Sequence, residues 1–258
     1  MTTTVPRPAI ALQGVSLDLG GRTILHDITF DAAPGSFVTI IGASGSGKTT
    51  LLRLIAGLYV PSKGRVLLNG AAVTGPSRDV AIVFQDYGRA LLPWRTAAGN
   101  VSLAFEANGT PRAERSDRIH ALLAKVGLGQ HADKYPSQLS GGMQQRLQIA
   151  RALAQGASIL LMDEPFGALD AMTRQSLQDE VLILAADTGA TVIFITHDLE
   201  EALYLGDRII ALTSNPGRIA NSATIQLPRP RSQLATREHP DFLALRRDMF
   251  SIMQDLHA

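Results

Sequence analysis

Residues 42–49 read Gly-Ala-Ser-Gly-Ser-Gly-Lys-Thr and stand between an apolar run and a helical pattern. Glycines at this spacing before Lys and Thr are typical of a loop that binds nucleotide phosphates, provided that a strand precedes the loop and a helix follows it. Because glycines let the backbone turn tightly, successive N–H groups and the positive end of the helix can surround the β- and γ-phosphates. The motif therefore favours an α/β fold that binds a nucleotide.

Lys48 and Thr49 carry the chemistry of this loop. Lys48 adds a mobile positive charge for the phosphates, and the Thr49 hydroxyl is placed to join the coordination of Mg²⁺. A glycine-rich turn with a surface lysine is the alternative, and the flanking strand and helix argue against it. The predicted phosphate-binding residues are Gly42, Ala43, Ser44, Gly45, Ser46, Gly47, Lys48, Thr49 and Thr50.

Length and composition restrict the remaining possibilities. With 258 residues the chain can form one large α/β domain, or a core that carries a smaller inserted lobe. A formal net charge of +1 argues against a strongly electrostatic partner such as bulk duplex DNA and leaves specific weak contacts open. The chain has no cysteine, which excludes disulfides and thiolate metal sites and permits a reducing compartment. Met1–Pro8 lacks the pattern of a secretory signal, and no apolar run reaches the roughly 18 residues of a membrane span, so we expect the chain itself to be soluble.

Apolar runs bounded by Gly, Asn and Pro alternate with helical patterns along the chain. Strands are predicted at Ile10–Leu19, Ile24–Phe30, Phe37–Ile41, Arg65–Leu68, Val80–Phe84, Ser158–Met162, Thr191–Ile195 and Arg208–Leu212. Helices are predicted at Lys48–Ala56, Ala97–Ala107, Arg112–Val126, Met143–Leu153, Met172–Ala186 and Pro240–Leu256. Strand–helix–strand units imply a parallel sheet, and residues 86–154, where strand signals are few, indicate an inserted helical lobe.

Two carboxylates follow the apolar strand that ends at Met162. The end of this strand should face the phosphates, because ligands of open α/β sheets bind at the carboxyl edge. We expect Asp163 to hold Mg²⁺, through water, and Glu164 to orient and polarise the attacking water as general base. Paired acids at a strand end are often only a solvated edge, and the phosphate loop upstream favours the catalytic interpretation.

A second glycine-rich segment, Leu139–Arg146, opens a helix. Ser140 is placed to cap that helix, and Gly141 and Gly142 leave their backbone N–H groups accessible. The segment therefore predicts another anion site. A loop cannot readily fold onto a distant loop of its own domain. An antiparallel homodimer, in which this segment covers the γ-phosphate held by the other subunit, explains both sites. The alternative is an ordinary helix start.

These residues together resemble the ATP-binding-cassette (ABC) ATPase family. Five segments occur in the order and spacing of that family: the phosphate loop, Leu139–Gln145 as the family signature, Ile159–Glu164, Gly167–Asp170 and His197. The resemblance covers residues 10–215. The resemblance implies a single ABC ATPase domain over 1–258, with a P-loop NTPase (RecA-like) core at 1–85 and 155–227. It further implies an N-terminal antiparallel β subdomain, a helical signature subdomain at 86–154, and a tail with a helix at 228–258.

The resemblance also implies roles for three more residues. Gln85 looks like the glutamine that touches Mg²⁺ and water and couples the ATPase to a permease. Asp170 matches the loop that crosses the dimer seam, and His197 matches the histidine that contacts the γ-phosphate. A histidine alone in a Thr-His-Asp turn is more often structural, and its place directly after a core strand favours the functional role.

Two residues depart from the family pattern. Met143 stands where the family usually has glutamine, which removes a polar contact to nucleotide. Leu19 stands where relatives commonly place an aromatic residue that stacks on adenine, and loss of that stacking is worth about 1 kcal/mol. We therefore predict modest nucleotide affinity and weak base selectivity.

The segment Asp86–Arg95 concentrates bulky apolar residues and contains Trp94, the only tryptophan of the chain. A tryptophan in a loop favours a docking groove for a partner helix over core packing. Residues 91–95 and Ser214–Arg218 resemble the corresponding segments of the ABC importers of nitrate, aliphatic sulfonates and taurine. Related branches, which import thiamine or pyrimidine precursors, have similar segments. The resemblance implies membrane-spanning permease subunits that dock near Gln85 to Trp94, a solute-binding protein, and a peripheral position at the cytoplasmic face of the cell (inner) membrane.

Two other functions share parts of this pattern. A DNA-repair or chromosome-maintenance ATPase also has a phosphate loop and a signature helix, but usually inserts long coiled coils, and the chain has no sustained heptads. A small-molecule kinase leaves the second glycine site and His197 unexplained. The arginines of the tail can contact lipid headgroups or a regulatory partner, or can simply be solvated: Arg229, Arg231, Arg237, Arg246 and Arg247.

Overall fold

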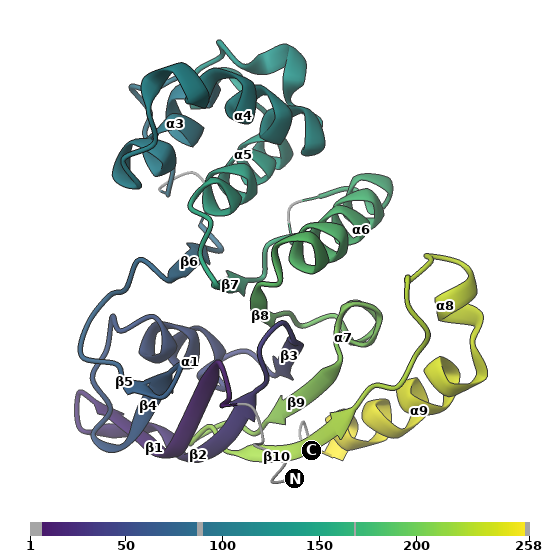
Figure 1. Ribbon diagram of the computed structural model, residues 1–258. Helices are drawn as coiled ribbons and strands as arrows, with labels where there is room; N and C mark the ends of the chain where they lie inside the picture. Colours follow the sequence, from purple (N-terminus) through teal and green to yellow (C-terminus); the bar gives the residue numbers. More distant parts are fainter. Residues whose placement is uncertain (1–6, 87–89, 168, 256–258) are drawn as a thin grey trace, which may run out of the picture. The chain divides into compact units, whose positions relative to one another are not determined.

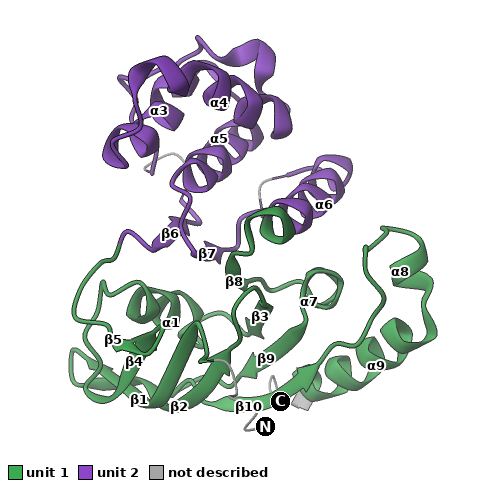
Figure 2. Ribbon diagram, in the orientation of Figure 1, with its two compact units in different colours: residues 1–77, 185–258 green, residues 78–184 purple. Residues whose placement is uncertain are grey.

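The computed structural model describes residues 7–86, 90–167 and 169–255. The chain divides into two compact units, one formed by residues 1–77 and 185–258 and the other by residues 78–184, coloured green and purple in Figure 2. We call them the first and second units. Within the described ranges, no helix has both the length and the apolar character needed to cross a lipid bilayer.

The first unit contains an antiparallel sheet of order β2-β1-β4-β5, which confirms the predicted N-terminal β subdomain (Figure 1). Gly20 and Gly21 join its longest strands and have φ of 55° and 76°, as a tight hairpin turn requires. Leu19 pairs with Arg22 across this turn. The strands are β1 (Ile10–Leu19), β2 (Arg22–Ala32), β4 (Lys63–Leu68) and β5 (Ala71–Ala72).

The first unit also holds the central parallel strands. Strand β3 pairs in parallel with β8 on one side and β9 on the other, and β10 pairs antiparallel with β9. Every residue of β3 and of β8 is buried, which explains their uninterrupted apolar sequence. The elements are β3 (Phe37–Gly42), α1 (Lys48–Ile55), β8 (Thr191–Ile195), α7 (Leu199–Leu205), β9 (Arg208–Leu212) and β10 (Ile219–Thr224).

The second unit combines one pair of parallel strands, β6 (Val80–Val83) and β7 (Ile159–Asp163), with a group of helices. Helix α5 packs against α3, α4 and β6. The side chain of Thr96 caps α3 and that of Ser140 caps α5, as N-terminal signals of this kind predict. The helices are α3 (Ala97–Ala107), α4 (Arg112–Lys125), η1 (Gly129–His131), η2 (Pro136–Gln138), α5 (Gly141–Ala154) and α6 (Ala171–Thr188), which continues four residues into the first unit.

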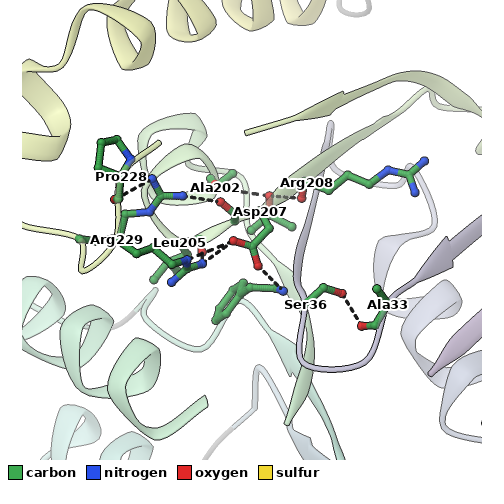
Figure 3. Close-up of polar contacts among 12 residues, drawn as sticks. Ala33, Ser36, Ala202, Leu205, Asp207, Arg208, Pro228 and Arg229 are labelled. Carbon is green, nitrogen blue, oxygen red and sulfur yellow. Dashed lines mark hydrogen bonds and ion pairs between the residues drawn. The ribbon is translucent and has the colours of Figure 1, made fainter. Parts of the chain in front are cut away.

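Four arginines of the tail bind other residues of the first unit, an outcome that none of the sequence interpretations included. Arg229 Nη2 donates to Asp207 Oδ1 at 2.6 Å, and Asp207 Oδ2 accepts from the backbone N of Phe37 at 2.9 Å. Figure 3 shows Arg229 and Asp207 directed toward each other. Arg237 and Arg246 each donate to one carboxylate oxygen of Glu200, at 2.8 and 2.9 Å. The contacts with Glu200 tie α8 (Ala235–Glu238) and α9 (Pro240–Asp255) to α7, and the contact of Arg229 ties the chain before α8 to Asp207 and the start of β3.

Candidate active site

The phosphate loop joins β3 to α1 in the first unit. Gly47 takes a left-handed conformation with φ of 87° at the N-cap of α1, and no described side chain caps that helix. The first N–H groups of α1 are therefore open to an anion. Lys48 is 8% exposed, and its Nζ donates to the carbonyls of Gly42 at 2.8 Å and Ala43 at 3.0 Å. The lysine thus closes the loop onto its own first residues.

The loop is backed by β2 and by the turn that follows β9. A Cβ on Gly47 would lie 2.7 Å from Leu25 Cδ2, and a Cβ on Gly217 would lie 2.3 Å from the carbonyl oxygen of Ser46. Gly217 also donates to the carbonyl of Ile24 at 2.8 Å. The Ser214–Arg218 segment, which the sequence marked only as a family feature, therefore supports the backbone of the phosphate loop.

His197 lies at the same sheet edge as the loop. Strands β3 and β8 run parallel with Ile40 opposite Ile195, so both continue beyond their carboxyl ends in the same direction. His197 is exposed two residues later. Asp198 then caps α7, because its Oδ1 accepts from the backbone N of Glu201 at 3.1 Å. The first unit thus brings the loop and His197 to one edge of the sheet, where ligands of open α/β sheets bind.

The two predicted acids end β7 in the second unit. Asp163 is buried, whereas Glu164 is half-buried and takes a left-handed backbone conformation with φ of 45°. For a residue other than glycine this conformation costs about 1 kcal/mol, and such strain is concentrated at functional sites. Gln85, which follows β6, donates from Nε2 to Glu164 Oε2 at 3.3 Å. The glutamine and the candidate base are therefore in contact.

The signature segment begins α5 in the same unit. Ser140 is exposed, and its Oγ accepts from the backbone N of Met143 at 3.3 Å. Gln144 Nε2 donates to the carbonyls of Pro136 and Leu139, at 2.9 and 3.2 Å, which fixes the chain just before the cap. The arrangement leaves the N–H groups around Gly141 and Gly142 at an exposed helix start, where an anion is favoured.

Asp170 opens α6. Its Oδ1 accepts from the backbone N of Thr173 at 3.0 Å. Hydrogen bonding from the Thr173 side chain, and then from its backbone, lowers the pKa of the Asp170 carboxyl, so the capping carboxylate is retained until the pH falls through that lowered pKa. A Cβ on Gly142 would lie 2.9 Å from Leu169 Cδ2, which places the signature helix against the residue before Asp170. Ala168 lies outside the described residues.

The predicted residues thus form two groups, and each group lies within one unit. The phosphate loop, Thr49, Thr50 and His197 belong to the first unit, while Gln85, Asp163, Glu164, Asp170 and the signature segment belong to the second. Leu19, at the end of β1 in the first unit, is 39% exposed. The predicted Mg²⁺ ligands Thr49, Gln85 and Asp163 are a hydroxyl, an amide and a carboxylate, which suit a hard cation. Among the described residues, no group of three or more acids or histidines could hold a metal ion.

Trp94 is presented outward on a fixed segment. It is 71% exposed, whereas nearby Leu91 is buried. Asn100 is fully buried and holds the segment on both sides of Trp94: its Oδ1 accepts from Leu92 N at 2.9 Å, and its Nδ2 donates to Arg95 O at 3.0 Å. Tyr87, Gly88 and Arg89 of the predicted docking segment lie outside the described residues.

The sequence of this chain is similar to those of ATP-binding subunits of importers. Residues 25–167 match the ABC transporter family model. An aliphatic sulfonates import ATP-binding protein of Xanthomonas axonopodis pv. citri is 46% identical over 239 residues, which are 92% of this chain and 93% of that protein. A nitrate import ATP-binding protein of Synechococcus elongatus is 45% identical over 239 residues, which are 91% of this chain and 36% of that longer protein.

The fold also matches that of a solved ATP-binding cassette. The dimeric structure of a post-hydrolysis state of an ATP-binding cassette bound to ADP and Pi has a TM-score of 0.74 at 32% identity, and the match covers 84% of this chain and 99% of that chain. The predicted P-loop NTPase fold is confirmed. With a family model matched over more than half of its residues and a relative matched along nearly its whole length, this chain belongs to the ABC transporter family.

Proposed function

We propose that the chain is the ATP-hydrolysing subunit of an ABC importer and acts as a homodimer on membrane permease subunits. The observation that carries this proposal is the presence of two anion sites made of backbone N–H groups, one in each unit. The loop at Gly42–Thr49 opens onto α1, and the Ser140-capped start of α5 is exposed. One nucleotide needs only one such site, so two sites favour a nucleotide held between two copies.

The phosphate loop is assigned to the β- and γ-phosphates of ATP. The ammonium group of Lys48 donates to two loop carbonyls. When ATP binds, it is positioned to bind the phosphates with its positive charge. Thr49, Gln85 and Asp163 would hold Mg²⁺, which supplies neutralisation of the phosphate charge. Glu164 accepts the proton of the attacking water, and His197 contacts the γ-phosphate.

Closure of the dimer follows from the second site. Ser140, Gly141 and Gly142 of one copy would cover the γ-phosphate on the phosphate loop of the other, and Asp170 would lie at the seam between them. ATP binding therefore favours the closed dimer, and cleavage of the γ-phosphate removes the bridge and lets the dimer open. The exposed Trp94 would pass this motion to the permease.

The wider assembly is proposed on the same basis. The core at 1–85 and 155–227, the helical subdomain at 86–154 and the tail at 228–258 would form one ATPase domain. It would lie at the cytoplasmic face of the inner membrane, held there by the permease, and a solute-binding protein would deliver the cargo. The cargo would be a small solute of the nitrate, aliphatic sulfonate or taurine type, recognised by the other subunits. No nucleic acid partner is proposed.

Replacing Trp94 with Ala tests the docking role. We expect ATP hydrolysis by the isolated chain to stay within about twofold of wild type, and transport by the assembled complex to fall about tenfold or more, because an exposed tryptophan at an interface centre is a common binding hot spot. Leu234→Ala, at another exposed apolar residue of the first unit, is the control and should leave transport unchanged. Equal losses of ATPase and transport in Trp94→Ala would instead assign Trp94 to folding.

Replacing Leu19 with Tyr tests the departure at the adenine position. We expect ATP to bind about fivefold more tightly, with a larger preference over GTP, because stacking on adenine adds about 1 kcal/mol. A nucleotide titration measures both quantities. Leu58→Tyr is a matched control, since Leu58 is 45% exposed and Leu19 39%. Unchanged affinity and base preference in Leu19→Tyr would show that Leu19 does not face adenine.

A further inference from the structure

Gln148 is a fully buried polar residue on α5, and the proposed mechanism does not use it. Its side-chain amide lies against both backbone polar groups of Phe84. Oriented as hydrogen bonding requires, its Oε1 accepts from Phe84 N at 2.7 Å and its Nε2 donates to Phe84 O at 3.0 Å. The planar amide of a glutamine carries both a donor and an acceptor, and so can pair with the N–H and the C=O of one residue. Phe84 lies one residue beyond β6, so Gln148 holds the chain where the strand ends.

A second glutamine ties the same helix to the other end of the same strand. Gln155 ends α5, and its Nε2 donates to the carbonyls of Arg78 at 2.9 Å and Val80 at 3.0 Å. The two glutamines are seven residues apart, about two helical turns, and so lie on one face of α5. The signature helix is therefore attached to β6 at both ends of the strand.

Gln148 connects the signature helix with the candidate base through a short path. Phe84 directly precedes Gln85, whose side chain reaches Glu164 at 3.3 Å. Ser140 caps the start of α5, and the proposed function places it on the nucleotide of the other copy. All of these residues belong to the second unit. A displacement of α5 that carries Gln148 must therefore move the backbone of Phe84 or break both hydrogen bonds of the buried Gln148 amide. Leaving a buried amide unpaired is costly.

We propose that Gln148 is a positioning residue that couples the signature helix to Gln85. It fixes the backbone before Gln85 to α5. As a result, when Ser140 binds a nucleotide, Gln85 becomes aligned with Glu164 at the same time. The inference rests on the proposed function. It adds that the alignment depends on this one side chain and not on the attachment of α5 to β6 in general.

Replacing Gln148 with Leu, which fills similar space without hydrogen bonding, tests the proposal, with Gln155→Leu as the matched control. Both variants remove a two-bond attachment of α5, but only Gln148 binds the residue that directly precedes Gln85. We expect Gln148→Leu to lower kcat about tenfold or more, since small misplacements at a reaction centre cost up to about a hundredfold. Its KM for ATP should stay within about twofold, because the phosphate loop is not involved. Gln155→Leu should keep kcat within about twofold of wild type.

Equal kcat values in the two variants, or a rise in KM without a fall in kcat for Gln148→Leu, would overturn the proposal. Should Gln148→Leu fail to fold, hydrogen exchange of the wild-type protein decides: the Phe84 amide should be protected to the level of β6, and rapid exchange at that amide would overturn the coupling. Absence of ATP hydrolysis by the wild-type chain would count against the proposed function alone, since the exchange measurement needs no turnover.

Discussion

Replacing Glu164 with Gln should strongly reduce ATP turnover while leaving ATP binding intact and trapping a dimer. A positioned general base contributes about 10²- to 10⁴-fold to a rate, so we expect kcat to fall by at least about a hundredfold. Gln has nearly the shape of Glu and keeps the contact with Gln85, so the strained backbone at φ of 45° is not disturbed. Phosphate release measures the rate, and sedimentation with ATP measures the dimer.

Glu114→Gln is the control for this prediction. Glu114 lies on α4, and its side chain is 55% exposed in an ion pair with Arg118, which is worth at most about 1 kcal/mol. The control should hydrolyse ATP at the wild-type rate and form no trapped dimer. Hydrolysis at the wild-type rate in Glu164→Gln would remove the base assignment, whatever the control shows.

Replacing Ser140 with Asp should prevent ATP-dependent dimerisation and turnover without loss of the signature helix. Aspartate caps a helix as well as serine does, so the bond now received from Met143 N is retained. Its charge, however, would face the γ-phosphate of the other copy. Like charges brought together cost several kcal/mol, so turnover should fall by about a hundredfold or more.

Ser140→Asn separates charge from shape in this prediction. Asparagine also caps helices but carries no charge, so this variant should keep a dimer and a larger share of the activity. Circular dichroism should show the same helix content in both variants and in the wild type. If Ser140→Asp hydrolyses ATP as fast as Ser140→Asn does, then Ser140 does not meet a phosphate.

Elements with strong local signals were predictable from the sequence. The phosphate loop lies between β3 and α1 as expected, and α1 ends at Ile55 with Ala56 as its C-cap, within one residue of the prediction. Strands β3 and β8 are buried on both faces, and such strands have continuous apolar sequences that are easily recognised. Helix α9 continues to Asp255, where the described residues end.

Elements whose signals are weak were missed. Strand β10 reads Ile-Ala-Asn-Ser-Ala-Thr and becomes a strand only by pairing with β9. Helix α7 has only seven residues, although Asp198 followed by Glu201 is a capping signal that would have located it. The short elements β5 and α8 were missed as well.

Long-range contacts were not accessible from the sequence at all. Gln148 and Phe84 are 64 positions apart, and Arg237 and Glu200 are 37 apart. No local pattern distinguishes a glutamine on α5 that reaches a strand from one that faces solvent. The same applies to Gly217, whose contact with Ser46 depends on how β9 lies beside β3.

If each reaction centre is made by two copies of the chain, then mixing two inactive variants should restore ATP hydrolysis. Lys48→Ala removes the charge of the phosphate loop, and Ser140→Asp blocks the signature site. In a mixed dimer one centre carries both lesions and the other carries none. The mixture should recover up to about a quarter of the wild-type ATPase rate, since half of the dimers are mixed and one of their two centres is intact. An ATPase rate no higher than that of the separate variants, in a mixture shown to contain mixed dimers, would show that the two copies do not share a reaction centre.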